Sequence, residues 1–188
     1  MKAKRYRTEP WALRDVPEEL RHLDTWVCYW RKGPGFVLIN PLSGIQVHPK
    51  TGPIFGTFKA VLFRLAQDPD LDGIGLVLTP QDPYAVVKLP ESELPEQLFA
   101  EAPPRTYVEF SPNGSHWHFW IKLAGEAPPL RYLTTTGFVP LTGAAPTESP
   151  NTIMEMQFAK TLESGDQYFL PIGFDDLLDK LLQWPEDM

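Results

Sequence analysis

The sequence predicts an α+β fold with a largely antiparallel sheet, and three observations support this prediction. Short runs rich in β-branched and aromatic residues recur along the chain, separated by turn-forming Gly, Pro and Asn. Only a few segments carry apolar residues at helical spacing. The 188 residues include 21 prolines, which favour loops and strand edges over long helices. Consecutive hairpins with few helices are typical of α+β proteins.

The length of the chain suits a single domain. We predict a basic flexible segment over residues 1–15 and one domain over residues 16–188. No run of about 18 apolar residues occurs, and the first residues lack the apolar stretch of a signal peptide. The lone cysteine, Cys28, permits no internal disulfide and is expected to be a small core residue. We therefore expect a cytoplasmic protein that does not contact a membrane.

The first half of the chain is expected to form two helices and two hairpins. Pro17, Glu18 and Glu19 suit the first turn of one helix, and Thr57 suits the N-cap of the other. Lys-Gly-Pro-Gly and Asp-Pro supply the turns of the two hairpins. The predicted elements are a helix over 16–23, strands over 25–30 and 36–40, a helix over 57–67, and strands over 73–79 and 84–89.

The second half is organised around a Ser-Pro-Asn-Gly-Ser turn, which suits a tight reversal between two strands. The predicted elements are a helix over 92–102, strands over 106–111 and 116–123, an irregular stretch over 125–143 with a helix near Arg131, paired strands over 152–158 and 167–173, and an amphipathic helix over 174–184.

Charge is distributed unevenly along the chain. Residues 1–64 contain 11 Lys and Arg against 5 Asp and Glu, whereas residues 65–188 contain 6 against 19. Nucleic-acid-binding proteins usually present a basic face, and only the first third could supply one here. Its basic residues are Lys2, Lys4, Arg5, Arg7, Arg14, Arg21, Arg31 and Lys32. A nucleic-acid surface and a basic tail that aids solubility both remain open.

The strand after the Ser-Pro-Asn-Gly-Ser turn carries the sharpest candidate site. Alternation places His116, His118, Trp120 and Lys122 on one face. The other face, with Trp117, Phe119, Ile121 and Leu123, is apolar and expected against the core. The first face could hold a phosphate on His118 and Lys122 and stack a base on Trp120. The alternative is an exposed sheet face whose long side chains are only solvated.

Metal-dependent chemistry has weaker support. Two histidines two residues apart could ligate a metal only with a third ligand from elsewhere, so no metal site is predicted. The carboxylates near these strands are Asp82, Glu91, Glu93, Glu109 and Glu155. An isolated glutamate within a strand, such as Glu155, more often faces solvent. No phosphate-binding glycine loop, nucleophile elbow or zinc-protease motif occurs.

Six segments together resemble a known family. They are VPEELRHLDTWVCYW, NPLSG, FGTFKAVLFRLA, DGIGLVLTPQDPYAVVKLPES, TYVEFSPNGSHWHFWIK, and IMEMQF with QYFLPIG. In this order they resemble six parts of the primase-polymerase domain of phage and plasmid replication proteins. These parts are its opening helix and strand, its N-P-x-[ST]-G turn, its W-G-T-F helix, its D-P-[FY] strand pair, its S-P-S-G-x-G-x-H segment and its last strands. This domain belongs to the archaeo-eukaryotic primase superfamily, and the resemblance covers roughly residues 16–173.

The resemblance implies an RRM-like, largely antiparallel sheet flanked by helices, with a smaller N-terminal α/β unit. It also implies that Ser111, Gly114 and His118 match a nucleotide-contacting turn and histidine, and that Glu155 matches the acid of the third motif. The family's metal-binding Asp-x-Asp is replaced here by Lys88 and Pro90. A charged lysine offers donors and no acceptor, so Lys88 cannot ligate a divalent cation.

We therefore expect a catalytically degenerate domain that binds DNA or nucleotide in the replication of a plasmid, phage or mobile element. The expected binding residues are Lys88, Ser111, Asn113, His116, His118, Trp120 and Lys122. No cofactor is expected, and a helicase or other replication protein is a candidate partner. One alternative is a protein-interaction module that does not bind nucleic acid. The other is an active nucleotidyltransferase that uses Mg or Mn on substituted acids such as Glu91, Glu109 and Glu155.

Overall fold

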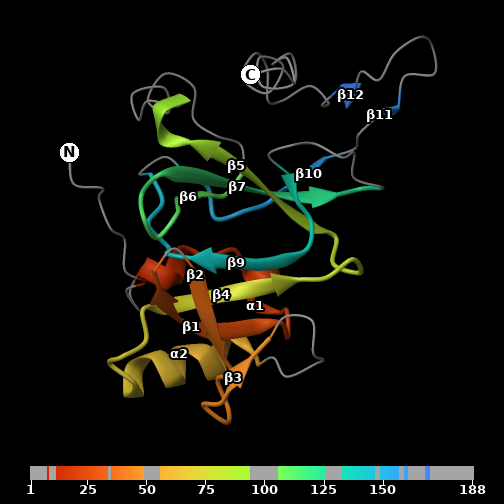
Figure 1. The fold of residues 1–188 in the computed structure, drawn as a ribbon. Helices are drawn as coiled ribbons and strands as arrows, with labels where there is room; N and C mark the ends of the chain where they lie inside the picture. Colours follow the sequence, from red (N-terminus) through yellow and green to blue (C-terminus); the bar gives the residue numbers. More distant parts are fainter. Residues whose placement is uncertain are drawn as a thin grey trace.

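The computed structural model describes residues 8, 12–33, 35–48, 56–93, 106–125, 133–146, 149–156, 159–160 and 168–169 (Figure 1). The described residues form mostly antiparallel strands with few helices, which confirms the α+β class. Residues 1–7 and the predicted helix over 174–184 lie outside the described residues. Of the predicted helix over 92–102, only residues 92 and 93 are described. No helix in the described ranges has both the length and the apolar character needed to cross a membrane.

Sheet A contains five antiparallel strands in the order β3-β2-β1-β4-β9. They are β1 (Trp26–Lys32), β2 (Gly35–Ile39), β3 (Gln46–Val47), β4 (Gly73–Leu78) and β9 (Gly137–Leu141). The predicted first hairpin is confirmed, since Cys28 pairs with Ile39 and Lys32 with Gly35. Gly33 has a φ of 60° in its turn, a conformation that glycine adopts without steric cost.

Sheet B has the order β10-β7-β5-β8, and β6 also pairs with β7. Its strands are β5 (Tyr84–Pro90), β6 (Val108–Phe110), β7 (His116–Leu123), β8 (Leu133–Thr134) and β10 (Met154–Met156). The predicted hairpin of β6 and β7 is confirmed, with Val108 opposite Phe119. Two short strands, β11 (Ala159–Lys160) and β12 (Tyr168–Phe169), pair with each other.

The predicted hairpin of β4 and β5 is wrong, because these strands belong to different sheets. β4 pairs with β1 and β9, and β5 pairs with β7 and β8. The turn that connects β4 to β5 is held by its own side chains. Asp82 accepts hydrogen bonds from the Thr79 amide at 2.7 Å and the Thr79 hydroxyl at 2.9 Å. A turn signal therefore marks a change of sheet here.

Two further strand predictions need correction. The stretch over 125–143, predicted to be irregular, contains β8 and β9, while the helix predicted near Arg131 falls outside the described residues. Pro140 lies in β9, the edge strand of sheet A, where a residue without an N–H is tolerated. The predicted pairing of 152–158 with 167–173 is also wrong. β10 runs parallel to β7, and β12 pairs with β11.

The helices pack where their apolar spacing predicts. α2 (Phe58–Gln67) begins at Thr57, whose hydroxyl accepts from the Ala60 amide at 3.3 Å, so the predicted N-cap is confirmed. Val61 and Leu65 of α2 join a core cluster with Cys28. Burial raises the pKa of the Cys28 thiol to about 12, as expected for an unreactive core residue. α1 (Glu18–Arg21), the 3₁₀ turn η1 (Ala12–Asp15) and η2 (Glu91–Glu93) complete the described helices.

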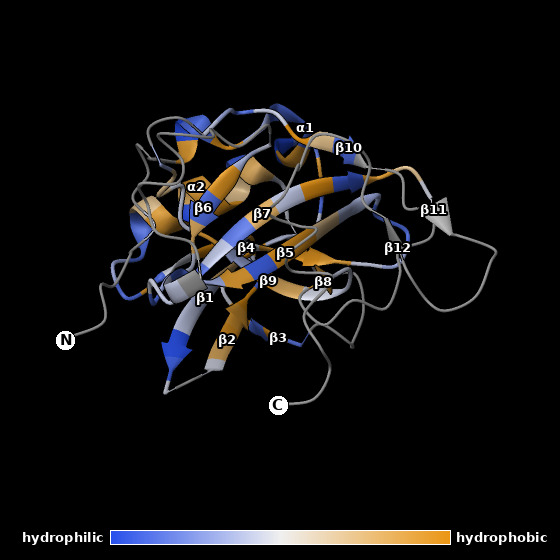
Figure 2. Ribbon diagram, turned by 90° about the horizontal axis from the view of Figure 1, so that it is seen from above, coloured by the Kyte–Doolittle hydropathy of each residue, from blue (hydrophilic) through white to orange (hydrophobic). Residues whose placement is uncertain are grey.

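The two sheets meet along β9. Figures 1 and 2 show β5 and β7 crossing over sheet A, with β9 as its nearest strand. The Thr142 hydroxyl donates to the Phe110 carbonyl at 2.7 Å, and the Phe110 amide donates to the Ala144 carbonyl at 3.0 Å. The end of β9 is thus tied directly to β6, which fixes the opening between the sheets.

Candidate functional site

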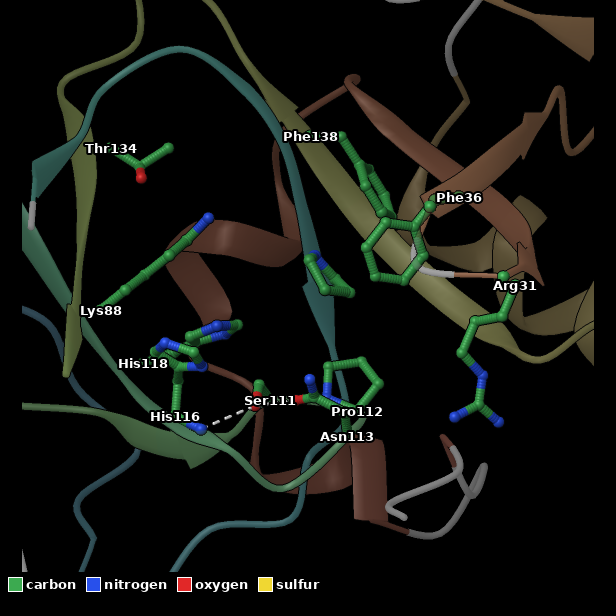
Figure 3. Close-up of a pocket in the computed structure, with 13 residues that line it drawn as sticks. Arg31, Phe36, Lys88, Ser111, Pro112, Asn113, His116, His118, Thr134 and Phe138 are labelled. Atoms are coloured by element: carbon green, nitrogen blue, oxygen red, sulfur yellow. Dashed lines mark hydrogen bonds between the residues drawn. The ribbon is translucent and has the colours of Figure 1, made fainter. Parts of the chain in front are cut away.

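A pocket of about 400 Å³ lies between the two sheets (Figure 3). Sheet B and its turn supply one side, and β1, β2 and β9 of sheet A supply the other. The described residues that line it are Arg31, Gly33, Gly35, Phe36, Lys88, Ser111, Pro112, Asn113, His116, His118, Thr134, Phe138 and Pro140.

The ionisable side chains of this lining are all basic, namely Arg31, Lys88, His116 and His118, and none of the thirteen described residues carries a carboxylate. The Arg31 guanidinium already has a partner, since it donates to Asp72 at 2.9 Å. Lys88 has no ion-pair partner among the described residues. Burial lowers the pKa of Lys88, as expected for a cation with no counter-charge beside it.

Lys88 and His118 face each other across the ladder of β5 and β7. His118 is only 3% exposed, and its Nδ1 has no hydrogen-bond partner among the residues that the structure describes. Burial, together with the charges of Lys88 and His116, lowers the pKa of His118 to about 3, and a hydrogen bond to the Pro140 carbonyl opposes this shift. The ring is therefore neutral at pH 7. It donates to the carbonyl and presents an unsatisfied acceptor beside a lysine.

The turn before β7 holds the rest of the basic wall in place. Asn113 Oδ1 accepts from the Ser111 hydroxyl at 2.8 Å, the Ser115 hydroxyl at 2.7 Å and the Ser115 amide at 3.1 Å. The His116 amide donates to Ser111 Oγ at 3.1 Å (Figure 3). Gly114 has a φ of 69°, which closes the turn. Ser111 and Asn113 thus line the pocket as parts of a rigid loop.

Sequence reasoning missed the aromatic wall opposite the cations. Phe36 and Phe138 lie edge to face with ring centroids 5.1 Å apart, and each also packs on Tyr29. A Cβ at Gly75 would lie 2.4 Å from Phe138 Cε2, so only glycine leaves room for this ring across β4. The alternating glycines of Asp-Gly-Ile-Gly were the available signal, because a strand glycine marks a close approach.

The expectation that Trp120 offers a base-stacking surface is wrong. Its indole is fully buried and donates from Nε1 to Glu109 Oε1 at 3.2 Å. Trp117 and Phe119 on the opposite face are buried as well. β7 is thus covered on both faces along its centre, and the two-residue alternation could not distinguish a solvated face from a second core face.

Lys122 and Glu155 lie away from the pocket lining. They are cross-strand neighbours on β7 and β10, and Lys122 Nζ is 3.8 Å from Glu155 Oε2. Both side chains are well exposed. The structure therefore brings together five of the seven predicted binding residues, namely Lys88, Ser111, Asn113, His116 and His118, and places Trp120 and Lys122 elsewhere.

The Glu109 carboxylate is part of a buried hydrogen-bond network and does not line the pocket. It is fully buried and accepts from the Thr142 and Gly143 amides, both at 2.9 Å, and from the Tyr107 hydroxyl and Trp120 indole, both at 3.2 Å. Burial raises its pKa to about 7, and these hydrogen bonds oppose the shift. Neither Glu109 nor Glu155 is among the described pocket residues, and the described residues contain no group of three candidate metal ligands.

His118 and Glu109 are expected to make opposite contributions to the pH dependence of stability. Between about pH 3 and 6.5 the unfolded chain binds a proton that folded His118 does not, so His118 makes stability rise with pH. Between about pH 4.5 and 7 the folded chain holds a proton on Glu109 that the unfolded chain has lost, so Glu109 makes stability fall. The two slopes cancel between pH 4.5 and 6.5.

His118→Gln should remove one of these slopes. From pH 4.5 to 6.5, the difference in unfolding free energy between wild type and variant should shift by roughly 2–3 kcal/mol in favour of wild type. Urea unfolding at the two pH values measures it. A difference that stays constant with pH would show that His118 titrates normally in the folded protein.

Comparison with known proteins adds no identity. No family model matches the chain, and no curated protein matches it. The geometry and chemistry of the pocket are therefore the basis on which a function can be proposed.

Proposed function

We propose that this chain is a catalytically degenerate primase-polymerase-like domain that binds a phosphate group of nucleic acid or nucleotide in the pocket between its sheets, without a metal ion. The observation that carries the proposal is the basic lining of the pocket. Lys88, His116 and His118 line it together, and none of the described lining residues carries a carboxylate, although the buried Glu109 pairs with His118 across β6 and β7. A site that held divalent cations would need oxygen ligands instead.

An anion relieves the main electrostatic cost of this pocket. Lys88 is partly buried and has no described counter-charge, and His118 is kept neutral partly by the charge of Lys88. A phosphate beside them would favour their protonated forms and raise both pKa values. Its oxygens accept hydrogen bonds from ammonium and imidazolium groups, and such charge-assisted bonds are short and strong.

The resemblance gives this chemistry a context. Lys88 stands at the position where the family carries a metal-binding aspartate, so its ammonium would occupy the place of a metal beside the phosphate. The same reasoning supports the finer fold assignment, an RRM-like sheet with a smaller N-terminal α/β unit. It also supports a cytoplasmic role in the replication of a plasmid, phage or mobile element, with a helicase or other replication protein as partner.

Matched lysine variants test the proposal. Fluorescence anisotropy of labelled single-stranded DNA and of a labelled nucleotide would be measured across a salt series, with EDTA present throughout. Lys88→Met should weaken binding about tenfold or more, because it removes a partly buried charge-assisted contact. Lys122→Met removes the same charge from an exposed position on the neighbouring strand and should change binding less than about threefold.

Two outcomes would contradict the proposal. Equal effects of the two variants would mean that any binding reflects general charge, and not the pocket. Absence of binding to wild type even at low salt would remove nucleic acid and nucleotide as ligands.

An interaction module remains the second candidate, because one surface is unusually apolar. Leu42 and Ile45 in the turn after β2, and Phe63 on α2, are 72%, 67% and 66% exposed. Arg64 of α2 donates to the Pro41 carbonyl at 3.0 Å, which holds this turn against the helix. Loss of a co-purifying protein on Leu42→Ser with Phe63→Ser, and DNA binding unchanged, would favour this candidate.

A further inference from the structure

We propose that the pocket takes a single nucleoside monophosphate unit, with its base against Phe36 and Phe138 and its phosphate on Lys88 and His116. This inference rests on the proposed phosphate binding and adds the base-contacting residues and the size of the ligand. It assigns a ligand-binding role to sheet A, whereas the phosphate contacts come from sheet B.

The pocket has two chemically different sides. Figure 3 shows Lys88, His116 and His118 grouped at one side and Phe36 and Phe138 at the other. A ligand that satisfies both must be anionic at one end and flat and apolar at the other. A nucleoside monophosphate has this character, whereas free phosphate would leave the aromatic side uncovered.

The aromatic side is exposed and rigid at once. Phe36 is 40% exposed, although it packs edge to face on Tyr29 at 85° and on Phe138 at 63°. Tyr29 is fully buried and anchors the group. A ring held in this way loses little freedom when a base covers it, so most of the stacking energy appears as affinity.

The polar side carries an independent sign of a missing partner. His118 is 3% exposed, and no described residue makes a hydrogen bond with its Nδ1. Buried polar atoms are usually satisfied, so an unsatisfied atom in a pocket wall points to a bound group. A sugar hydroxyl would supply the donor that the neutral ring lacks, and a protonated ring would instead donate from Nδ1 to a phosphate oxygen.

The space available favours one unit over a continuous strand. The cavity of about 400 Å³ lies near the lower end of small-molecule pockets, which span roughly 300–1,000 Å³. The terminal nucleotide of a strand and a free nucleoside monophosphate present the same chemistry to this pocket.

The test compares AMP, ribose 5-phosphate and adenosine by isothermal titration calorimetry on the full chain. Phe36→Leu removes the ring at the pocket, and Phe63→Leu removes an exposed ring from α2 as the control. AMP should bind at least about fivefold more tightly than ribose 5-phosphate. Phe36→Leu should abolish that preference and leave ribose 5-phosphate binding unchanged, while Phe63→Leu should alter neither.

The failures are distinguishable. If wild type binds AMP no more tightly than ribose 5-phosphate, and Phe36→Leu changes neither affinity, the aromatic contact is overturned while phosphate binding stands. If adenosine binds as tightly as AMP and Lys88→Met has no effect, the phosphate site is overturned. If none of the three probes binds, both proposals fail. The single-unit site would be overturned if an oligonucleotide bound far more tightly than AMP and if blocking its 5′ end or its 3′ end reduced that affinity equally.

Discussion

Replacing Glu109 by alanine is expected to lower the free energy of unfolding by at least about 3 kcal/mol, because it leaves several buried donors unsatisfied. The Thr142 and Gly143 amides, the Trp120 indole and the Tyr107 hydroxyl all donate to this carboxylate. These donors come from the residue before β6, from β7 and from the segment after β9, so the loss would also loosen the junction between the sheets. Urea unfolding followed by circular dichroism measures the effect.

Glu155→Ala is the matched control. It deletes the same side chain from an exposed position whose ion pair with Lys122 is long and solvated, so stability should change by less than about 0.5 kcal/mol. Similar midpoints for the two variants would show that Glu109 is not the structural junction that its hydrogen bonds indicate. Glu109→Gln keeps one carbonyl acceptor and should lie between wild type and Glu109→Ala.

Replacing Gly75 by alanine is the second large effect expected, a loss of about 1–3 kcal/mol from overpacking. The new Cβ would lie 2.4 Å from Phe138 Cε2 and 2.5 Å from the Val139 carbonyl oxygen. The carbonyl belongs to the paired strand and cannot swing away, so β4 and β9 must shift apart. Phe138 would be displaced with them, and the preference for AMP over ribose 5-phosphate should fall.

Gly35→Ala provides the comparison for this variant. Gly35 also lines the pocket, but the nearest atom to its added Cβ is the Lys32 carbonyl oxygen at 3.7 Å, an ordinary contact. Its unfolding free energy should stay within about 0.5 kcal/mol of wild type. If both alanine variants unfold at the same denaturant concentration, the close approach of Phe138 to β4 does not constrain the fold.

Local features of the sequence were predictable, and long-range pairings were not. The hairpin of β1 and β2 and the N-cap at Thr57 depend on neighbouring residues, so the sequence alone identified them. β9 contains only Gly137–Leu141, with a proline inside, and becomes a strand because β4 offers it an edge. The β4–β5 turn failed as a hairpin signal because nothing local reports which sheet a strand will join.

In the candidate site too, residues that are close in the sequence could be predicted, and residues brought together by long-range pairing could not. Ser111, Asn113, His116 and His118 lie within one turn and the strand that follows, so the sequence placed them together. Their neighbour Lys88 was identified through a resemblance, and its pairing with His118 depends on the register of distant strands. Phe36 and Phe138 escaped notice because they are 102 positions apart in the sequence and neither belongs to a polar motif.

The strand order of sheet A has a consequence for how this chain can fold. β9 is made last of its five strands, and until residues 137–141 exist, the apolar β4 keeps one edge unpaired. The Thr8 hydroxyl donates a hydrogen bond to the Leu141 carbonyl, 133 residues further along the chain, so this bond also cannot form until β9 is present. Fragments that end before β9 should therefore associate through that open edge instead of forming an independent N-terminal unit. With so much of its pairing between distant residues, the domain should fold slowly for its size.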